Sequence, residues 1–188
     1  MNYNKNLLKA EQQLVHTKEN MLWGEYSKYR SNNDLLSYDL TIKVKPKQKY
    51  ISGNNKILFK MLKDDSTIQI DLYENLNINK ILHNKKPLKY TRESNAVYIH
   101  FDKALKANEI AEIDFHYSGN PATTGRFGCF TFQKDNLGKH WINTACQGSG
   151  SMVWWPTKDQ QRDEVDKMVM RISVPSDLMD VSNGRLIN

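Results

Sequence analysis

The sequence predicts an all-β fold, an antiparallel sandwich or a saddle-shaped β domain, with a helix at its N-terminus. Two observations support this prediction. From residue 37 onward, apolar and polar side chains alternate with a period of two in several short runs, as in strands buried on one face. Turn-forming residues separate these runs and no helical repeat intervenes, which is typical of antiparallel strand pairing.

The N-terminal segment has a different repeat. Between residues 6 and 26, apolar pairs recur every seven positions, at Leu7-Leu8, Leu14-Val15 and Met21-Leu22. This spacing places one narrow apolar stripe along a helix, which we expect to pack on the rest of the protein; binding to a partner is the alternative. Residues 1–36 are therefore predicted to be a helical and linker segment, and residues 37–188 the β domain.

Six runs carry the strand pattern. In the first, Tyr38, Leu40, Ile42 and Val44 share one face, and polar residues occupy the other. The remaining runs are Ile57-Phe59-Met61, Ile68-Ile70-Leu72, Val97-Ile99-Phe101, Ile113-Phe115-Tyr117 and Met168-Met170-Ile172-Val174. Clusters of Ser, Gly, Asn and Pro predict turns at 52–55, 83–87, 118–121 and 182–184.

The C-terminus contains a hairpin signal without a second strand. Asn183-Gly184 is typical of a two-residue β-turn. Only Arg185-Leu186-Ile187-Asn188 follow it, fewer than the roughly five or six residues of an ordinary strand. We therefore expect the sequence to be a piece of a longer protein, with its last hairpin cut short.

Composition excludes some classes of protein. The 27 basic and 21 acidic residues give a net charge of +6, but the lysines alternate along the strands, as on a solvated sheet face, and no nucleic-acid-binding motif accompanies them. No run approaches the about 18 apolar residues that a membrane span requires. The first residues also lack the apolar core of a signal peptide, which leaves the localisation open.

The sequence contains no recognisable set of catalytic residues. It has no His-Glu-x-x-His motif, and its five histidines are isolated, with His100 and His116 expected at the surface or rim of strands. The two cysteines, Cys129 and Cys146, do not have metal-binding spacing; they could pair, but we favour two buried free thiols. A cluster of carboxylates is expected to be solvated or to form structural ion pairs: Asp159, Asp163, Glu164 and Asp166.

The segment from Trp141 to Pro156 is the most informative part of the chain. It contains three of the four tryptophans, Trp141, Trp154 and Trp155, on either side of Gly148-Ser149-Gly150-Ser151. Glycines let a backbone turn tightly or approach a ligand. Bulky aromatics beside such a turn indicate the edge of a binding site.

Several motifs, in order and spacing, carry a family resemblance. They are Tyr38-Asp39-Leu40-Thr41-Ile42-Lys43-Val44, Ile51-Ser52-Gly53, Ile57-Leu58-Phe59, Ile68-Gln69-Ile70-Asp71-Leu72, Tyr117-Ser118-Gly119-Asn120-Pro121, Thr144-Ala145-Cys146-Gln147-Gly148, Trp154-Trp155-Pro156, Val174-Pro175 and Val181-Ser182-Asn183-Gly184. Over about residues 33–188 the chain resembles the N-terminal domain of zinc aminopeptidases related to aminopeptidase N and leukotriene hydrolase, especially bacterial secreted-type members.

The resemblance implies a β-saddle that covers a following catalytic domain. In that family a glutamate or glutamine at the position of Gln147 helps to hold the free α-amine of a peptide substrate, and the residue at Gly148 lines the same wall. The other reading of Gln147 is that it caps a turn. The zinc ligands, the catalytic glutamate and the transition-state tyrosine belong to the following domain, so the resemblance implies zinc in the parent protein, none in this chain, and no peptide hydrolysis by this chain alone.

Two questions stay open at this point. The family's Asp-Glu-Pro element has no direct match, so its aspartate corresponds to either Asp159 or Asp163. The alternative function is a free-standing carbohydrate- or protein-binding β-sandwich, in which Trp141, Trp154 and Trp155 form an exposed platform. That alternative requires at least two of the indoles to be exposed and coplanar, whereas the peptidase reading lets them be mostly core.

Overall fold

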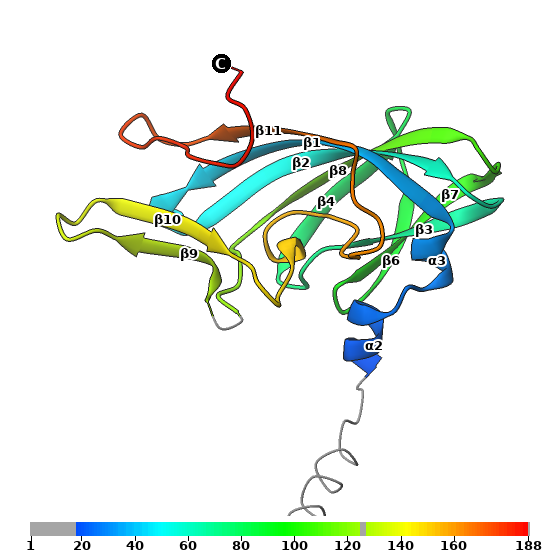
Figure 1. Ribbon diagram of the computed structural model, residues 1–188, viewed down its shortest axis with the longest axis horizontal. Coiled ribbons are helices and arrows are strands. Elements are labelled where there is room, and N and C mark those ends of the chain that lie inside the picture. The colour runs from blue at the N-terminus through cyan, green and yellow to red at the C-terminus, as the bar shows by residue number, and fades with distance from the viewer. Residues whose placement is uncertain (1–17, 125–126, 188) are drawn as a thin grey trace, which may run out of the picture.

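Strands dominate the computed structural model, which describes residues 18–124 and 127–187 (Figure 1). The elements in chain order are α2 Lys18–Gly24, α3 Lys28–Ser31, β1 Asn33–Lys45, η1 Pro46–Gln48, β2 Tyr50–Met61, β3 Asp65–Asp71, β4 Leu76–His83, β5 Lys86–Pro87, β6 Lys89–Glu93, β7 Ala96–Leu105, β8 Ile110–Gly119, β9 Cys129–Lys134, β10 His140–Ala145, η2 Ser151–Val153 and β11 Lys167–Ser173. The predicted all-β fold with an N-terminal helix is confirmed.

The strands form three sheets. The largest has the order β11-β1-β2-β8-β4-β5, a second has the order β3-β7-β6, and β9 and β10 form a separate two-stranded ribbon. Antiparallel pairing joins all of these strands except β1 and β11, which run parallel with Tyr38 opposite Met168. The expectation of antiparallel pairing is therefore wrong for β11. β1 and β11 are far apart in the chain, so strands β2 to β10 and their connections form the crossover that a parallel pair needs.

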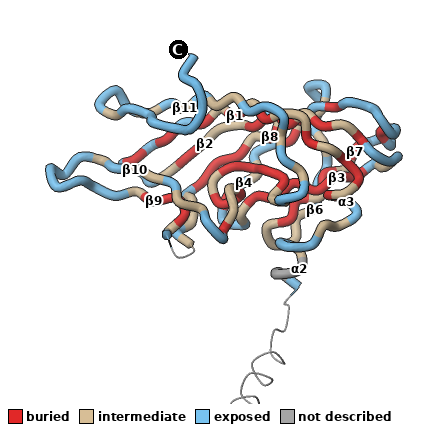
Figure 2. The backbone as a smooth tube through the Cα atoms, in the orientation of Figure 1, coloured by how far each residue is buried: buried red, intermediate tan, exposed pale blue. Residues whose placement is uncertain are grey.

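The core lies between the two larger sheets. The alternating apolar residues predicted in β1, β2, β3, β7 and β8 are buried, and Phe59 of β2 approaches Phe101 of β7 with ring centroids 6.2 Å apart. Figure 2 shows these buried stretches along the strands, with exposed backbone in the turns and toward the C-terminus. In β11, by contrast, Met168 is exposed and Met170 and Ile172 are half-buried, because this strand lies at the edge of its sheet.

One predicted turn is wrong. Residues 52–55 continue strand β2, and the chain reverses earlier, through Pro46–Gln48 and Lys49, whose φ is 50°. Gly53 lies opposite Ile42, where an added Cβ would overlap the carbonyl oxygen of Thr41. The glycine therefore serves the close approach of two strands and not a turn. The turn predicted at 83–87 is present at residues 84 and 85, between β4 and β5, whereas Ser118 and Gly119 are the last residues of β8.

The helix predicted near the N-terminus is found, but the hairpin predicted near the C-terminus is not. The predicted N-terminal helix is present over Lys18–Gly24, and its earlier part lies outside the described residues. Residues 174–187 contain no strand, so the hairpin expected at Asn183-Gly184 does not form, and most side chains there are exposed. Within the described ranges, no helix is both long and apolar enough to span a membrane.

Gly53 offers a test of the sheet packing. Substitution Gly53→Ala is expected to lower the free energy of unfolding by about 1–3 kcal/mol, because the added methyl group forces β1 and β2 apart. Urea denaturation of the purified chain measures this loss. Gly24→Ala is the control, since a Cβ at Gly24 meets no atom within 4 Å, and an equal loss in both variants would contradict the packing argument.

Candidate functional site

The site predicted around Gln147 is a tight turn between the ribbon and η2. Strand β10 ends at Ala145, and the backbone N–H groups of Ser149 and Gly150 both donate to the carbonyl oxygen of Cys146, at 3.2 and 3.0 Å. Gly148 has a φ of 83°, in the left-handed region that favours glycine. Gln147 is exposed, and its carboxamide makes no hydrogen bond to any residue that the structure describes. It therefore does not cap the turn.

A disulfide joins this turn to strand β9. Cys129, the first residue of β9, is bonded to Cys146, so the prediction of two free thiols is wrong. The reason is the ribbon itself, which the sequence pattern did not reveal: Ala145 lies opposite Cys129, and this register brings the next residue, Cys146, to the same end of the ladder. A disulfide that closes a loop of this size contributes about 3 kcal/mol in the chain-entropy model.

The three tryptophans of the segment have different environments. Trp155 is 7% exposed and packs edge-on against Tyr38, with ring centroids 5.0 Å apart. Trp154 is half-buried against Phe130, and its plane is 72° from that of Trp155. Only Trp141, on the ribbon, is well exposed, at 60%. Because no two of them are exposed and coplanar, the platform required by the binding-module alternative does not form.

The backbone after Trp155 is fixed to the main body. Thr157 and Asp71 exchange backbone hydrogen bonds of 2.7 and 3.0 Å, as in a short β-bridge. The side-chain amide of Asn55 donates to the carbonyl oxygen of Pro156 at 2.9 Å. The Tyr38 hydroxyl lies 3.1 Å from the Thr157 hydroxyl, and burial raises the pKa of Tyr38. These contacts hold the C-terminal end of the segment from Trp141 to Pro156 against strands β1, β2 and β3.

A buried ion pair lies beneath this segment. The guanidinium of Arg30, in α3, donates to both carboxylate oxygens of Asp71 at 2.7 and 3.2 Å, and to the carbonyl oxygen of Glu25 at 2.6 Å. Asp71 also accepts from the Gln69 amide and from the backbone N–H of Asp159, each at 3.0 Å. Burial raises the pKa of the Asp71 carboxyl, and the Arg30 guanidinium opposes that rise. Sequence reasoning did not single out this pair.

A second buried ion pair joins Lys158 to Asp163. The Lys158 ammonium also donates to the carbonyl oxygen of Asn33 at 2.7 Å, and Asp163 accepts from the backbone N–H of Leu35 at 3.2 Å. Burial lowers the pKa of Lys158, and the Asp163 carboxylate opposes this shift. The expectation of a structural ion pair is thus confirmed for Asp163. Glu164 and Asp166, by contrast, are exposed.

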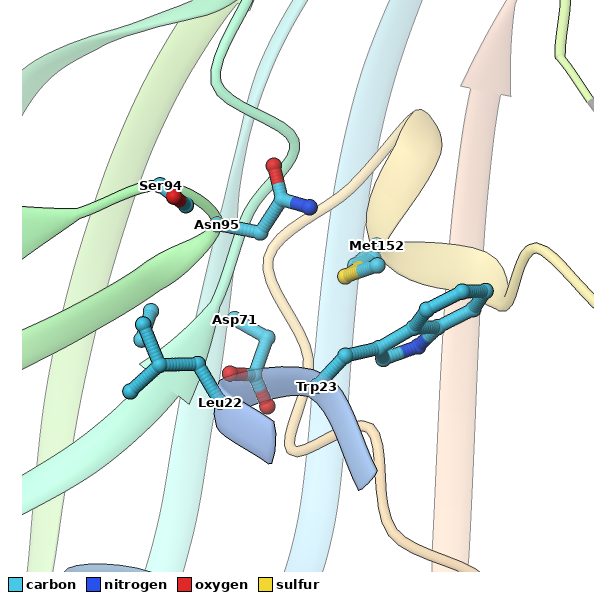
Figure 3. Close-up of a pocket in the computed structure, with 7 residues that line it drawn as sticks. Leu22, Trp23, Asp71, Ser94, Asn95 and Met152 are labelled. Carbon is cyan, nitrogen blue, oxygen red and sulfur yellow. The ribbon is translucent and has the colours of Figure 1, made fainter. Parts of the chain in front are cut away.

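Asp159 connects the N-terminal helix to the turn. Its carboxylate accepts a 3.0 Å hydrogen bond from the Trp23 indole, and it occupies the space that a Cβ on Gly150 would need. Burial raises the pKa of Asp159, and the Trp23 hydrogen bond opposes the rise. Figure 3 shows the crevice beside it, where Trp23 of α2 lies near Asp71 and Met152. Both acids that resemble the family's aspartate therefore have partners within this domain.

The described part of the chain contains no group of three or more His, Cys, Asp or Glu residues that could hold a metal ion. His100 lies between the hydroxyls of Thr67 and Thr91, each 3.1 Å from a ring nitrogen. His116 contacts Asp114 on the same strand at 2.9 Å. Both histidines are half-buried strand residues with hydrogen-bond partners, whereas the sequence predicts surface or rim positions in strands.

A family model, the peptidase M1 N-terminal domain, matches residues 35–188. The chain belongs to this family. Among solved structures, a two-domain M1 zinc metallopeptidase bound to L-arginine has 19% identity and a TM-score of 0.65, over 83% of this chain and 37% of that one. The M1 zinc metallopeptidase from Deinococcus radiodurans has 20% identity and a TM-score of 0.64, over 77% and 33%. Native yeast LTA4 hydrolase has 14% identity and a TM-score of 0.65, over 89% and 27%.

The solved structures show that this M1 N-terminal domain shares its fold with zinc metallopeptidases. The matched part covers 27% to 37% of the three neighbouring chains. No curated protein matches it. The family match and the neighbours agree with the β-saddle that the sequence motifs predict.

The buried ion pair provides the test for this region. Asp71→Ala is expected to lower the free energy of unfolding by about 3–5 kcal/mol, because it leaves the Arg30 charge buried without its partner. Asp64→Ala, which removes the exposed ion pair with Lys106, is the matched control and should change stability little. Thermal and urea unfolding of both variants check the difference, and a small effect of Asp71→Ala would show that the pair does not hold the segment.

Proposed function

We propose that this domain forms one wall of the substrate site of a zinc aminopeptidase and helps to bind the free α-amine of peptide substrates. The observation that carries this proposal is the exposed, unpaired carboxamide of Gln147, presented by a turn whose ends are tied down. A carboxamide oxygen accepts a hydrogen bond from an ammonium group. The family membership and the zinc metallopeptidase neighbours support the same role.

Gly148 supports the recognition of a ligand backbone. A Cβ at this position would meet no atom within 4 Å, so the space beside the turn is open. A ligand can therefore approach the backbone of Gly148 as closely as a glycine allows.

The chemistry of hydrolysis is assigned to the following domain of the parent protein. In the proposed enzyme that domain supplies the zinc ion, which polarises the peptide carbonyl, and the general base. Gln147 and Gly148 would contribute binding and orientation. The separate 188-residue chain would then contribute half of a substrate site and no catalytic group.

The role of Gln147 can be tested in the longer protein. Gln147→Ala is expected to reduce kcat/KM for substrates with a free α-amine by about ten- to hundredfold, the loss of a hydrogen bond to a charged group worth about 1.5–3 kcal/mol. Steady-state kinetics on aminoacyl substrates measure the change. Gln161→Ala removes another exposed glutamine, five residues beyond Pro156, and serves as the control. An unchanged kcat/KM in Gln147→Ala would remove this residue from the site.

A second prediction follows because the proposal assigns hydrolysis to the following domain and only substrate binding to this one. The 188-residue chain with added zinc should release no amino acid from peptide substrates, whereas the longer protein should do so. The reading frame that continues beyond Asn188 should encode a His-Glu-x-x-His motif. If that motif is missing downstream, the aminopeptidase proposal is wrong.

A further inference from the structure

We infer that the Cys129–Cys146 disulfide is a positioning device for Gln147, so that recognition of the substrate amine depends on the redox state of this pair. The inference rests on the proposed function. Cys146 immediately precedes Gln147 in the chain, and the bond fixes it to the buried Cys129 of strand β9. The cross-link therefore acts at the residue next to the one that binds.

The disulfide contacts both ends of the turn. At the start, the Cys146 carbonyl oxygen accepts the N–H groups of Ser149 and Gly150, so fixing Cys146 also orients these amides. At the end, the Cys129 sulfur lies 3.7 Å from the carbonyl oxygen of Gly150. Gln147 is held between these two points, and its backbone follows any movement of Cys146.

The two sides of the turn are anchored differently. Downstream, Met152 accepts a 2.9 Å hydrogen bond from the backbone of Tyr73, and Trp155 is buried in the core. Upstream, the ribbon of β9 and β10 pairs with no other described strand; Phe130 anchors β9 in the core, whereas Cys146 lies one residue beyond the end of the ladder. Loss of the disulfide would therefore loosen Cys146, and with it Gln147, while the fold of the larger sheets persists.

Reduction is the chemical step that would release the turn. Two external thiols supply two electrons and two protons: their sulfurs join in a new disulfide, and Cys129 and Cys146 become thiols. Disulfides persist in oxidising compartments and are reduced in the cytosol. In this inference the disulfide-bonded form binds the substrate amine. A reducing environment would weaken that binding without altering any residue that contacts the substrate.

The test uses the longer protein with Cys129→Ala and Cys146→Ala combined. We expect KM for aminoacyl substrates to rise about five- to tenfold with a smaller change in kcat, because the binding group is misplaced while the reacting groups are untouched. In a Gln147→Ala background the same pair of substitutions should add almost nothing, since the disulfide acts through Gln147. If the two cysteine substitutions raise KM by the same factor in the wild type and in the Gln147→Ala variant, the inference is overturned.

Thr131→Ala is the matched control, because it removes the hydrogen bond to Asn143 within the same ribbon and leaves the disulfide intact. Its KM should stay near that of the wild type. A rise equal to that of the alanine pair would mean that ribbon stability, and not the disulfide, sets the site, and would overturn the inference.

Reduction of the wild type is an independent test. Dithiothreitol should raise KM in the wild type and leave the alanine pair unaffected; equal inhibition of both would reveal removal of zinc and overturn the redox claim. Hydrogen exchange at Ser149 and Gly150 separates the two proposals. If exchange accelerates on reduction but Gln147→Ala leaves kcat/KM unchanged, the turn is held by the disulfide and the proposed amine site fails. If exchange does not change, the positioning role fails, whatever Gln147 does.

Discussion

The buried pair of Arg30 and Asp71 is the interaction on which the rest of the structure depends. Two charges removed from water are costly unless their hydrogen-bonding groups are satisfied. Here the guanidinium has three acceptors and the carboxylate accepts from three residues. One donor is the backbone of Asp159, so the pair connects helix α3 and strand β3 to the segment that follows the site. The position of that segment is therefore determined by electrostatics as well as by apolar packing.

The network extends from this pair to the candidate site in short steps. The Asp159 carboxylate accepts a hydrogen bond from the Trp23 indole and fills the space beside Gly150. The backbone N–H of Gly150 in turn closes the turn that carries Gln147. Lys158, the residue before Asp159, is held through Asp163. Residues 18–34 precede the region matched by the family model, yet Trp23 and Arg30 lie among them. The N-terminal segment thus acts as part of the scaffold of the site and not as an appendage.

Period-two patterns predict β1, β2, β3, β7, β8 and β11, but they miss β4, β5 and β6. Tyr38, Leu40 and Ile42 in β1 are buried as expected, because hydrophobic burial is a property of each side chain. Gly53 was misjudged, since a glycine in a turn and a glycine at a close strand contact look alike in sequence. The ribbon of β9 and β10 was missed, and with it the disulfide. Arg30 and Asp71 are 41 positions apart, so only the folded chain brings them together. Gln147 was found through family motifs, not through periodicity.

In the proposed recognition of a substrate amine, this domain would supply a single hydrogen-bond acceptor. A neutral carboxamide on an exposed turn needs no buried counter-charge, so an unliganded Gln147 does not lower the stability of the fold. Its single hydrogen bond to an ammonium group is too weak to select a substrate alone. Selection would require a second wall that removes water and adds opposite charge. A weak acceptor contributes most when its position is fixed in advance, because little ordering remains to be done on binding. In the proposed site, the disulfide upstream of the turn and the ion pairs downstream of it would fix the position of Gln147.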